Sequence, residues 1–152
     1  MRIIMADAFD VANYFLNKVD EESGELISNL KLQKLVYFAQ GFHLAIYGKP
    51  LFENDIEAWA HGPVVSDLYH CYKEYGSGAI PCLDSSDTPT ISEEVAELLD
   101  EIYEIYGQFS AWRLRELTHD QPPWKDHYND KGLGLVIPHE AMRGYFKTQI
   151  EG

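Results

Sequence analysis

Histidines that lie near carboxylates are the residues of this sequence best suited to catalytic or metal-binding chemistry. His61 lies in the segment AWAHGPV, and His119 and His127 lie in the segment HDQPPWKDH together with Asp120 and Asp126. Two consecutive prolines interrupt the second segment, so its histidines do not have the helical spacing of zinc ligands. His61 has no nucleophile or second base beside it in the sequence. We therefore predict no catalytic residue and no metal site, and a hydrolase or nuclease that uses these histidines with acidic partners stays open as the alternative.

A stripe of polar side chains runs along a segment that is otherwise apolar on almost every side. Gln33, Tyr37 and Gln40 are spaced i, i+4, i+7, so they share one face of a predicted helix. Buried amides and hydroxyls need hydrogen-bond partners. The stripe is therefore either an internal hydrogen-bond network that braces the following loop, or a polar strip exposed in a groove for a partner.

The residues Trp59, His61, Gly62 and Pro63 follow as one short element. Glycine allows a backbone conformation that other residues adopt only with strain, and proline fixes its own φ near the helical value. The pattern indicates a folded corner held by a tryptophan, with Gly62 and Pro63 at the entry of the next helix. A binding role for His61 at this corner is the second interpretation.

Helical signals recur along the chain and define the elements that must position these residues. The first predicted helix begins at residue 7 or 10 and ends in the turn at 21–24. Further helices are predicted from a cap at residue 28 or 29 to 47, and at 63–75, 92–106, 110–117, from 122 and at 138–150. Tyr69 lies on the apolar face of the helix predicted at 63–75. Short strands within 51–60 and at 79–83 and a turn at 129–132 complete the pattern. The predicted fold is mainly α: a compact single-domain bundle of about seven helices, residues 1–152, around a buried central helix, with a minor β-hairpin.

Composition and charge restrict the classes of function. The chain has 152 residues, of which 45% are hydrophobic, and a formal net charge of −13. Nucleic-acid binding requires a surplus of cations, so we expect no nucleic-acid partner. No apolar run is long enough to cross a bilayer and the start lacks a secretory signal, so we expect no membrane partner and a cytoplasmic protein. Phosphate and dinucleotide fingerprints are absent, so no cofactor is expected. Cys71 and Cys82 form no metal or disulfide pattern, and Cys71 is predicted to be buried.

Three sequence blocks resemble the Panacea antitoxin domain family, which includes the SocA proteolytic adaptor and phage-associated GepA proteins. The blocks are LKLQKLVYFAQGFHLAIYGKPLF at 30–52, IEAWAHGPVVSDLYHCY at 56–72 and THDQPPW at 118–124. The matching motif positions include Lys34, Tyr37, Gln40, Trp59, Gly62, Pro63, Tyr69, His119 and Trp124. Their order and spacing extend the resemblance over most of the chain.

The resemblance implies a function through protein contacts and not through catalysis. It implies a mainly helical domain that neutralises a co-encoded toxin by direct contact, and that some members deliver the toxin to a Clp-type protease as proteolytic adaptors. The partners implied are therefore a cognate toxin and a Clp-type protease. The candidate partner-binding or motif positions are Gln33, Tyr37, Gln40, Trp59, His61, Gly62, Pro63, Tyr69, His119 and Trp124. Besides the hydrolase or nuclease, an acidic inhibitor that mimics DNA stays open, and it would require carboxylates in rows on one face.

Overall fold

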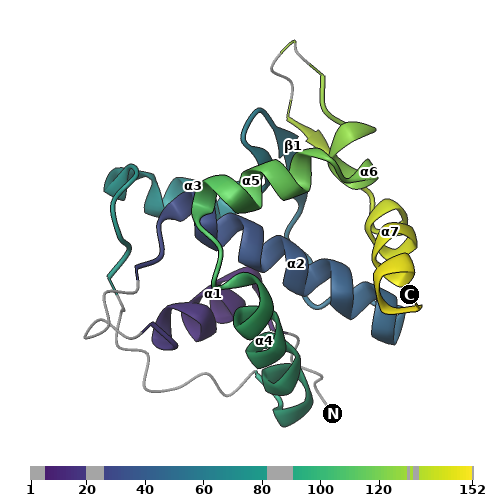
Figure 1. Ribbon diagram of the computed structural model, residues 1–152, viewed down its shortest axis with the longest axis horizontal. Coiled ribbons are helices and arrows are strands. Elements are labelled where there is room, and N and C mark those ends of the chain that lie inside the picture. Colours follow the sequence, from purple (N-terminus) through teal and green to yellow (C-terminus); the bar gives the residue numbers. More distant parts are fainter. Residues whose placement is uncertain (1–5, 20–25, 82–90, 130, 132–133, 152) are drawn as a thin grey trace.

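The centre of the fold is the helix α2 (Asn29–Tyr47), around which the other elements are arranged (Figure 1). In this computed structural model the described residues are 6–19, 26–81, 91–129, 131 and 134–151. The Ser28 hydroxyl caps α2 by accepting from the Lys31 amide, and Gly48 ends it in the left-handed conformation, with φ 73°. Residues 32–41 are all buried. The prediction of a buried central helix is therefore confirmed, because α2 has no solvent face along its middle.

The described part of the chain contains six further α-helices and a short 3₁₀ helix. They are α1 (Ala8–Asn17), α3 (Ser66–Tyr72), η2 (Lys73–Tyr75), α4 (Glu93–Tyr106), α5 (Ala111–His119), α6 (Pro122–Lys125) and α7 (His139–Glu151). Asp7, the first of the two predicted start positions, caps α1, and Ser92 and Ser110 cap α4 and α5. The helices α1, α3, α4, α5 and α7 all contact α2. The mainly helical fold class is confirmed.

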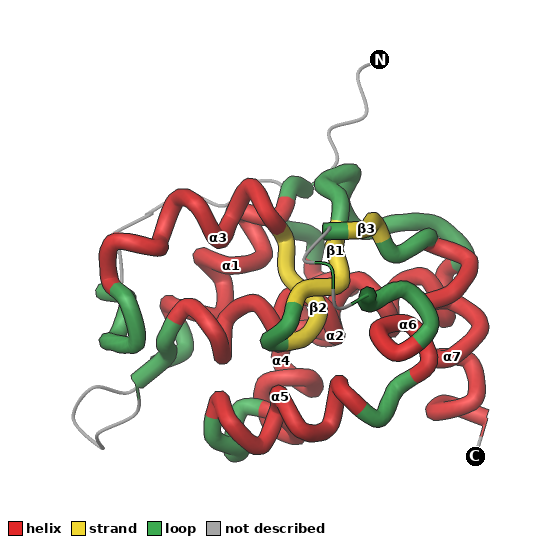
Figure 2. The backbone as a smooth tube through the Cα atoms, turned by 90° about the horizontal axis from the view of Figure 1, so that it is seen from above, coloured by secondary structure: helices red, strands yellow, loops and turns green. Residues whose placement is uncertain are grey.

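The β-structure is larger than the predicted hairpin and lies between α3 on one side and α6 and α7 on the other (Figure 2). The strands β1 (Ile56–Trp59) and β2 (Gly62–Val65) form an antiparallel hairpin in which Trp59 pairs with Gly62. A third strand, β3 (Leu135–Val136), adds to the other edge of β1 and gives the order β2-β1-β3. This small sheet joins the middle of the chain to its last third.

The predicted helix entry at Gly62 and Pro63 is wrong. Gly62 has φ 108°, which lies outside the helical region, and both residues belong to β2. Proline is tolerated in β2 because that strand is an edge of the sheet, where an amide is not needed on the outer side. The helix α3 begins three residues later than predicted, at Ser66.

Three smaller predictions also have outcomes. Cys71 is exposed and not buried, so that prediction is wrong, and Cys82 lies outside the described residues. In the strand predicted at 79–83, Ala79 forms an isolated bridge with Ser28 and the end of the segment lies outside the described residues. The turn predicted at 129–132 is also only partly described. None of the described helices has the length and apolar character needed to cross a membrane.

Candidate functional site

The turn between β1 and β2 gathers residues from all three motif blocks. We call residues 59–63 the hairpin corner. The helix α2 lies beneath it, and α3, α5 and α6 contribute the side chains around it. Blocks that are far apart in the sequence therefore meet at one place on the molecule (Figure 2).

One side of the hairpin corner is held by a stack of three aromatic rings. The indole nitrogen of Trp124 donates a 2.6 Å hydrogen bond to the backbone carbonyl of Trp59. The His119 ring lies parallel to the Trp124 ring, with 4.0 Å between the centroids and 9° between the planes. Tyr128 stacks with Trp124 at 4.7 Å and 15°. This stack fixes α5 and α6 against the end of β1.

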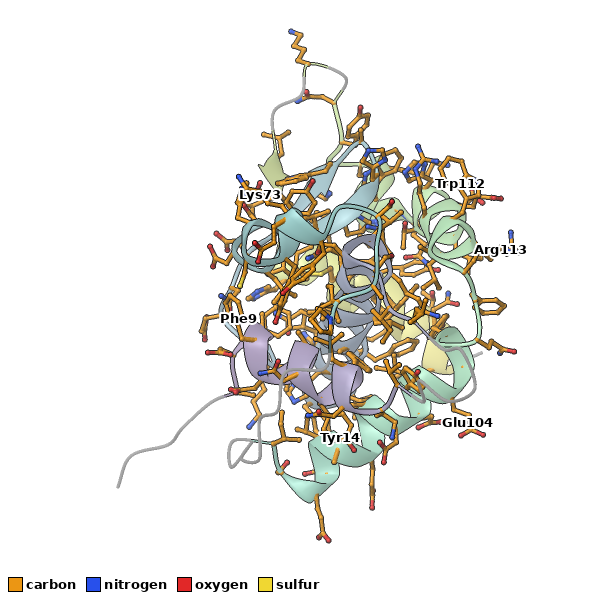
Figure 3. The ribbon with its side chains drawn as sticks, turned by 90° about the vertical axis from the view of Figure 1, so that its left-hand side faces the viewer. Phe9, Tyr14, Lys73, Glu104, Trp112 and Arg113 are labelled. Atoms are coloured by element: carbon orange, nitrogen blue, oxygen red, sulfur yellow. The ribbon has the colours of Figure 1, made fainter. Side chains whose placement is uncertain are left out.

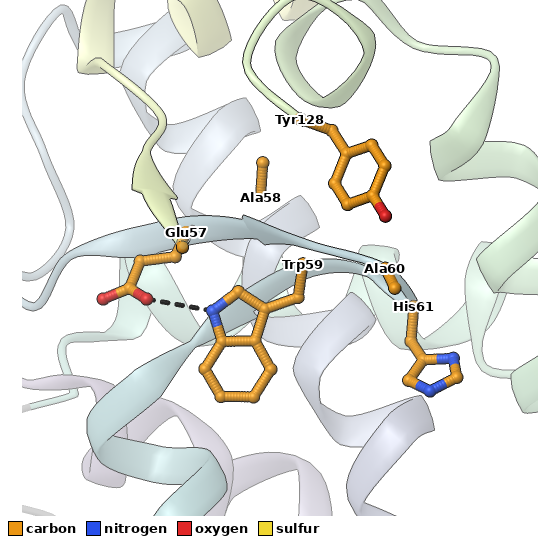
Figure 4. Close-up of a pocket in the computed structure, with 7 residues that line it drawn as sticks. Glu57, Ala58, Trp59, Ala60, His61 and Tyr128 are labelled. Carbon is orange, nitrogen blue, oxygen red and sulfur yellow. Dashed lines mark hydrogen bonds between the residues drawn. The ribbon is translucent and has the colours of Figure 1, made fainter. Parts of the chain in front are cut away.

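The Trp59 ring forms the opposite side of the corner. Its edge meets the Tyr69 ring at 4.9 Å between centroids and 68° between planes. Its indole nitrogen donates a 2.9 Å hydrogen bond to a carboxylate oxygen of Glu57, two residues earlier on the same strand (Figure 4). Both contacts hold the indole in one orientation while leaving it half-buried. The ring is therefore pre-positioned at an open surface.

Polar side chains of α2 support the corner from below. The ammonium of Lys34 donates to the carbonyl of Pro63 at 3.1 Å, and the Val65 amide donates to the Gln33 side-chain oxygen at 2.9 Å. The Tyr37 hydroxyl donates to the side-chain oxygen of Gln121, just before α6, at 2.8 Å. Gln33 and Tyr37 therefore connect α2 to β2 and to the α5–α6 connection.

Gln40 makes its hydrogen bonds to the loop that follows α2. Its side-chain oxygen accepts from the Leu51 amide at 2.7 Å, and its amide nitrogen donates to the Phe52 carbonyl at 2.8 Å. It fixes the loop that leaves α2 and does not reach the hairpin corner. The three residues of the polar stripe therefore support two different parts of the chain: Gln33 and Tyr37 support the region of the corner, and Gln40 supports the loop after α2. All three side chains are buried.

Gly62 is required by the space beneath the corner as well as by its positive φ. A Cβ atom at this position would lie 2.7 Å from Cε of Lys34 and 2.9 Å from the hydroxyl of Thr118. Both distances are shorter than van der Waals contact. The backbone of β2 can therefore approach α2 and α5 this closely only with glycine.

Burial sets the charge states beneath the corner. Lys34 is completely buried, and this burial, followed by the positive charge of Arg115, lowers its pKa from 10.5 to about 7. Burial and then Arg115 also lower the pKa of His119, so its imidazole is neutral at pH 7. Burial raises the pKa of Tyr37 well above 10. The site is therefore built mainly from neutral hydrogen-bonding groups at neutral pH.

Two open pockets flank the corner. The first, of about 400 Å³, is lined by Trp59, His61, Tyr128 and residues of β1 (Figure 4). The second, of about 290 Å³, also includes Trp59 and His61 and extends between Lys73 and Trp112, which Figure 3 shows on either side of this face. His61 is exposed, and Trp112 is 60% exposed. Aromatic walls with a few polar groups are suited to holding side chains of a peptide or protein.

The alternative of a hydrolase or nuclease that uses His61, His119 or His127 with acidic partners finds no support in this arrangement. His119 stacks on Trp124, while Nδ1 of His127 donates to the carbonyl of Pro123 at 2.8 Å. His61 lies at the turn of the hairpin. Within the described residues, no group of three or more histidines, cysteines and carboxylates could hold a metal ion. The arrangement offers aromatic and hydrogen-bonding contacts to a partner.

Lys34, Trp112 and Tyr128 lie at the corner but are not among the candidate partner-binding positions, and Lys34 matched only as a motif residue. Lys34 shares its helical face with Leu30 and Phe38, so its position among apolar residues was a signal that it is buried. Tyr128 follows Trp124 by four residues, and this spacing was a local signal for the stack of the two rings. The contribution of Trp112 depends on how α5 is placed, and no local pattern shows it.

Comparisons with known proteins agree with the motif blocks. Residues 32–125 match the family described as Antitoxin SocA-like, Panacea domain. The chain is also similar to Antitoxin SocA of Caulobacter vibrioides (strain NA1000 / CB15N), with 32% identity over an alignment that covers 94% of this chain and 84% of that protein. No solved structure matches the chain.

Proposed function

Because this chain belongs to the SocA-like Panacea antitoxin family, we propose that it is an antitoxin that neutralises a co-encoded toxin by direct protein contact. The proposal places this activity in the cytoplasm, carried by residues 1–152 as one domain and without catalysis. A net charge of −13 favours a toxin with a basic surface.

The observation that carries the proposal is the convergence of the three motif blocks on the hairpin corner. Trp59 and Trp124 are joined by a hydrogen bond, and His61 is presented to solvent between two aromatic pockets. We propose that the toxin contacts His61, Trp112 and the exposed part of Trp59. Aromatic side chains that are rigidly held beforehand lose little conformational entropy on binding, and they dominate many protein interfaces.

The buried motif residues have a different role in this proposal. Gln33, Tyr37 and Gln40 lie in the interior and make hydrogen bonds within the chain. They would influence toxin binding only by holding the corner and the following loop in place. Tyr69 and His119 would act similarly, through their ring contacts with Trp59 and Trp124.

Co-expression with the products of adjacent open reading frames tests the proposal. One small neighbouring product should arrest growth when expressed alone, and this chain should restore growth and co-purify with that product. Trp112→Ala and His61→Asp should weaken co-purification by about tenfold or more, as expected for central interface residues. If no neighbouring product is toxic or co-purifies, the antitoxin proposal is wrong.

A matched control separates the corner from a general surface effect. Leu26→Ala removes an aliphatic side chain that is 62% exposed and lies outside the residues that line either pocket of the corner. It should leave co-purification within about twofold of the wild type. If Leu26→Ala weakens the complex as much as Trp112→Ala does, the toxin does not bind specifically at the corner.

We further propose that this chain delivers the toxin to a Clp-type protease. In that case the toxin should be degraded faster in cells that contain this chain than in cells without it, and only when the protease is present. A pulse-chase measurement of the toxin in strains with and without the Clp protease tests this. Equal toxin half-lives in the two strains would show that neutralisation occurs by contact alone.

A further inference from the structure

A second apolar surface is formed outside the hairpin corner, where residues of α2, α4 and α7 line one pocket. Ile46 of α2, Ile105 of α4 and Ile150 of α7 are each 46% exposed and line one pocket of about 100 Å³. We call these three residues the isoleucine patch. Phe42 and Ile102 form further parts of the pocket wall. Exposed aliphatic side chains from three separate helices thus surround a hollow that fits a single aliphatic side chain.

The charges beside the isoleucine patch indicate what kind of molecule fits it. The helix α4 carries six carboxylates and no lysine or arginine: Glu93, Glu94, Glu97, Asp100, Glu101 and Glu104. Asp100 forms an ion pair with Lys18 at 2.6 Å, whereas Glu101 lines the pocket. Glu97 and Glu104 are exposed, and Figure 3 shows Glu104 at the surface of α4. The helix α7, which supplies Ile150, also carries Arg143 and Lys147. The α4 side is therefore the negative wall of the pocket.

We propose that the isoleucine patch is a second protein-docking site, which binds an amphipathic segment carrying an aliphatic anchor and lysine or arginine side chains. The anchor enters the pocket, and the cationic side chains face Glu97, Glu101 and Glu104. This is the geometry in which a helix binds a groove through a small number of apolar positions. The charged rim would set the orientation of the segment and its association rate.

The same charges disfavour the other occupants of an exposed apolar surface. The carboxylates of α4 repel the α4 helix of a second copy docked with α4 against α4, and they repel an anionic lipid surface. The proposal does not rest on the antitoxin function, because it uses none of the residues at the hairpin corner. The pocket at the isoleucine patch shares no lining residue with the two pockets at the hairpin corner.

A synthetic peptide tests the proposal with the full-length chain. The probe is a fluorescent helical peptide of about 16 residues with leucines at i, i+3, i+4 and i+7 and lysines at the remaining surface positions. Fluorescence anisotropy should show binding that is weakened about tenfold or more by Ile105→Asp and by Glu101→Lys. Val136→Asp is the matched control, because Val136 is also 46% exposed but lies on β3, and it should bind the peptide like the wild type.

Two control peptides distinguish docking in the pocket from unspecific charge attraction. A scrambled peptide of the same composition and a peptide with glutamates in place of lysines should both bind at least about tenfold more weakly than the probe. Each variant is first checked for wild-type circular dichroism, and Glu101→Lys tests the site without altering its apolar side chains. Equal binding of the scrambled peptide, or equal affinity of Ile105→Asp and wild type, would overturn the proposal. Dimerisation abolished by Ile105→Asp, or binding to anionic vesicles, would also overturn it.

Discussion

The ammonium of Lys34 donates a 3.1 Å hydrogen bond to the backbone carbonyl of Pro63, from a side chain that solvent does not reach. This bond joins the middle of α2 to the strand that begins at the hairpin corner. Gly62 makes the approach possible, because any Cβ there would collide with the Lys34 chain. The corner is therefore held from below by a lysine whose charge the interior disfavours.

The first prediction is that Lys34 makes the protein more stable as the pH rises above 7. Its pKa in the folded state is lowered to about 7 from 10.5, so the unfolded chain binds the proton more tightly. The free energy of unfolding therefore rises with pH between about 7 and 10. Between pH 7.5 and 9 the wild type should gain about 2 kcal/mol relative to Lys34→Met, which lacks the titrating group. Urea unfolding at several pH values measures this difference.

The control for this pH dependence is an exposed lysine. Lys73 lies at the surface, so Lys73→Met should leave the pH profile of the wild type unchanged. If wild type and Lys34→Met have parallel profiles from pH 7.5 to 9, Lys34 does not titrate differently in the two states. If Lys34→Met is too unstable to unfold cooperatively, Lys34→Gln provides the same comparison.

The second prediction concerns the hydrogen bond between Trp124 and Trp59. Trp124→Phe keeps an aromatic ring in the stack with His119 and Tyr128 but removes the indole donor, which leaves the Trp59 carbonyl without this bond. The expected loss of stability is about 1–3 kcal/mol. Trp112→Phe is the matched control and should change stability by less than about 0.5 kcal/mol, because that indole is 60% exposed. Equal losses in the two variants would show that the hydrogen bond does not stabilise the fold.

The helices could be predicted from the sequence because their signals are local. Ser28, Ser92 and Ser110 cap the helices that follow them, and the apolar spacing of each helix lies within its own residues. The strands could not be predicted equally well. Gly62 and Pro63 satisfy a local rule for helix entry, but pairing with β1 determines their conformation. β3 has only two residues, and its partners lie far earlier in the chain.

The candidate site was predicted as a set of residues but not as an arrangement. The spacing of Gln33, Tyr37 and Gln40 indicated that they need partners, and two of those partners, Val65 and Gln121, are 32 and 84 residues away. Nothing in the local sequence identifies such distant partners. The exposed side of the site, including Trp112, depends on the placement of α5 beside the hairpin. Only a three-dimensional structure supplies that information.

The third prediction is that Gln40 stabilises the loop after α2. Its side chain satisfies the buried amide of Leu51 and the buried carbonyl of Phe52. Gln40→Ala leaves both groups without a partner in the interior, so the protein should lose about 2–4 kcal/mol of stability. Gln149→Ala, on the exposed face of α7, should cost less than about 0.5 kcal/mol. Chemical denaturation of the two variants measures the difference, and equal small losses would contradict the assignment.

The fourth prediction compares two glycines in helices that pack against each other. A Cβ at Gly41 of α2 would lie 2.2 Å from two ring carbons of Phe146 of α7, whereas a Cβ at Gly144 of α7 would meet no atom within 4 Å. Alanine is a better helix former than glycine, so Gly144→Ala should stabilise the protein by about 0.5–1 kcal/mol. Gly41→Ala has the same local benefit but must displace the Phe146 ring, so it should destabilise by about 1–3 kcal/mol. Thermal unfolding of both variants measures the effects. A stabilising Gly41→Ala would mean that α2 and α7 are not packed as closely as their contact at Phe146 requires.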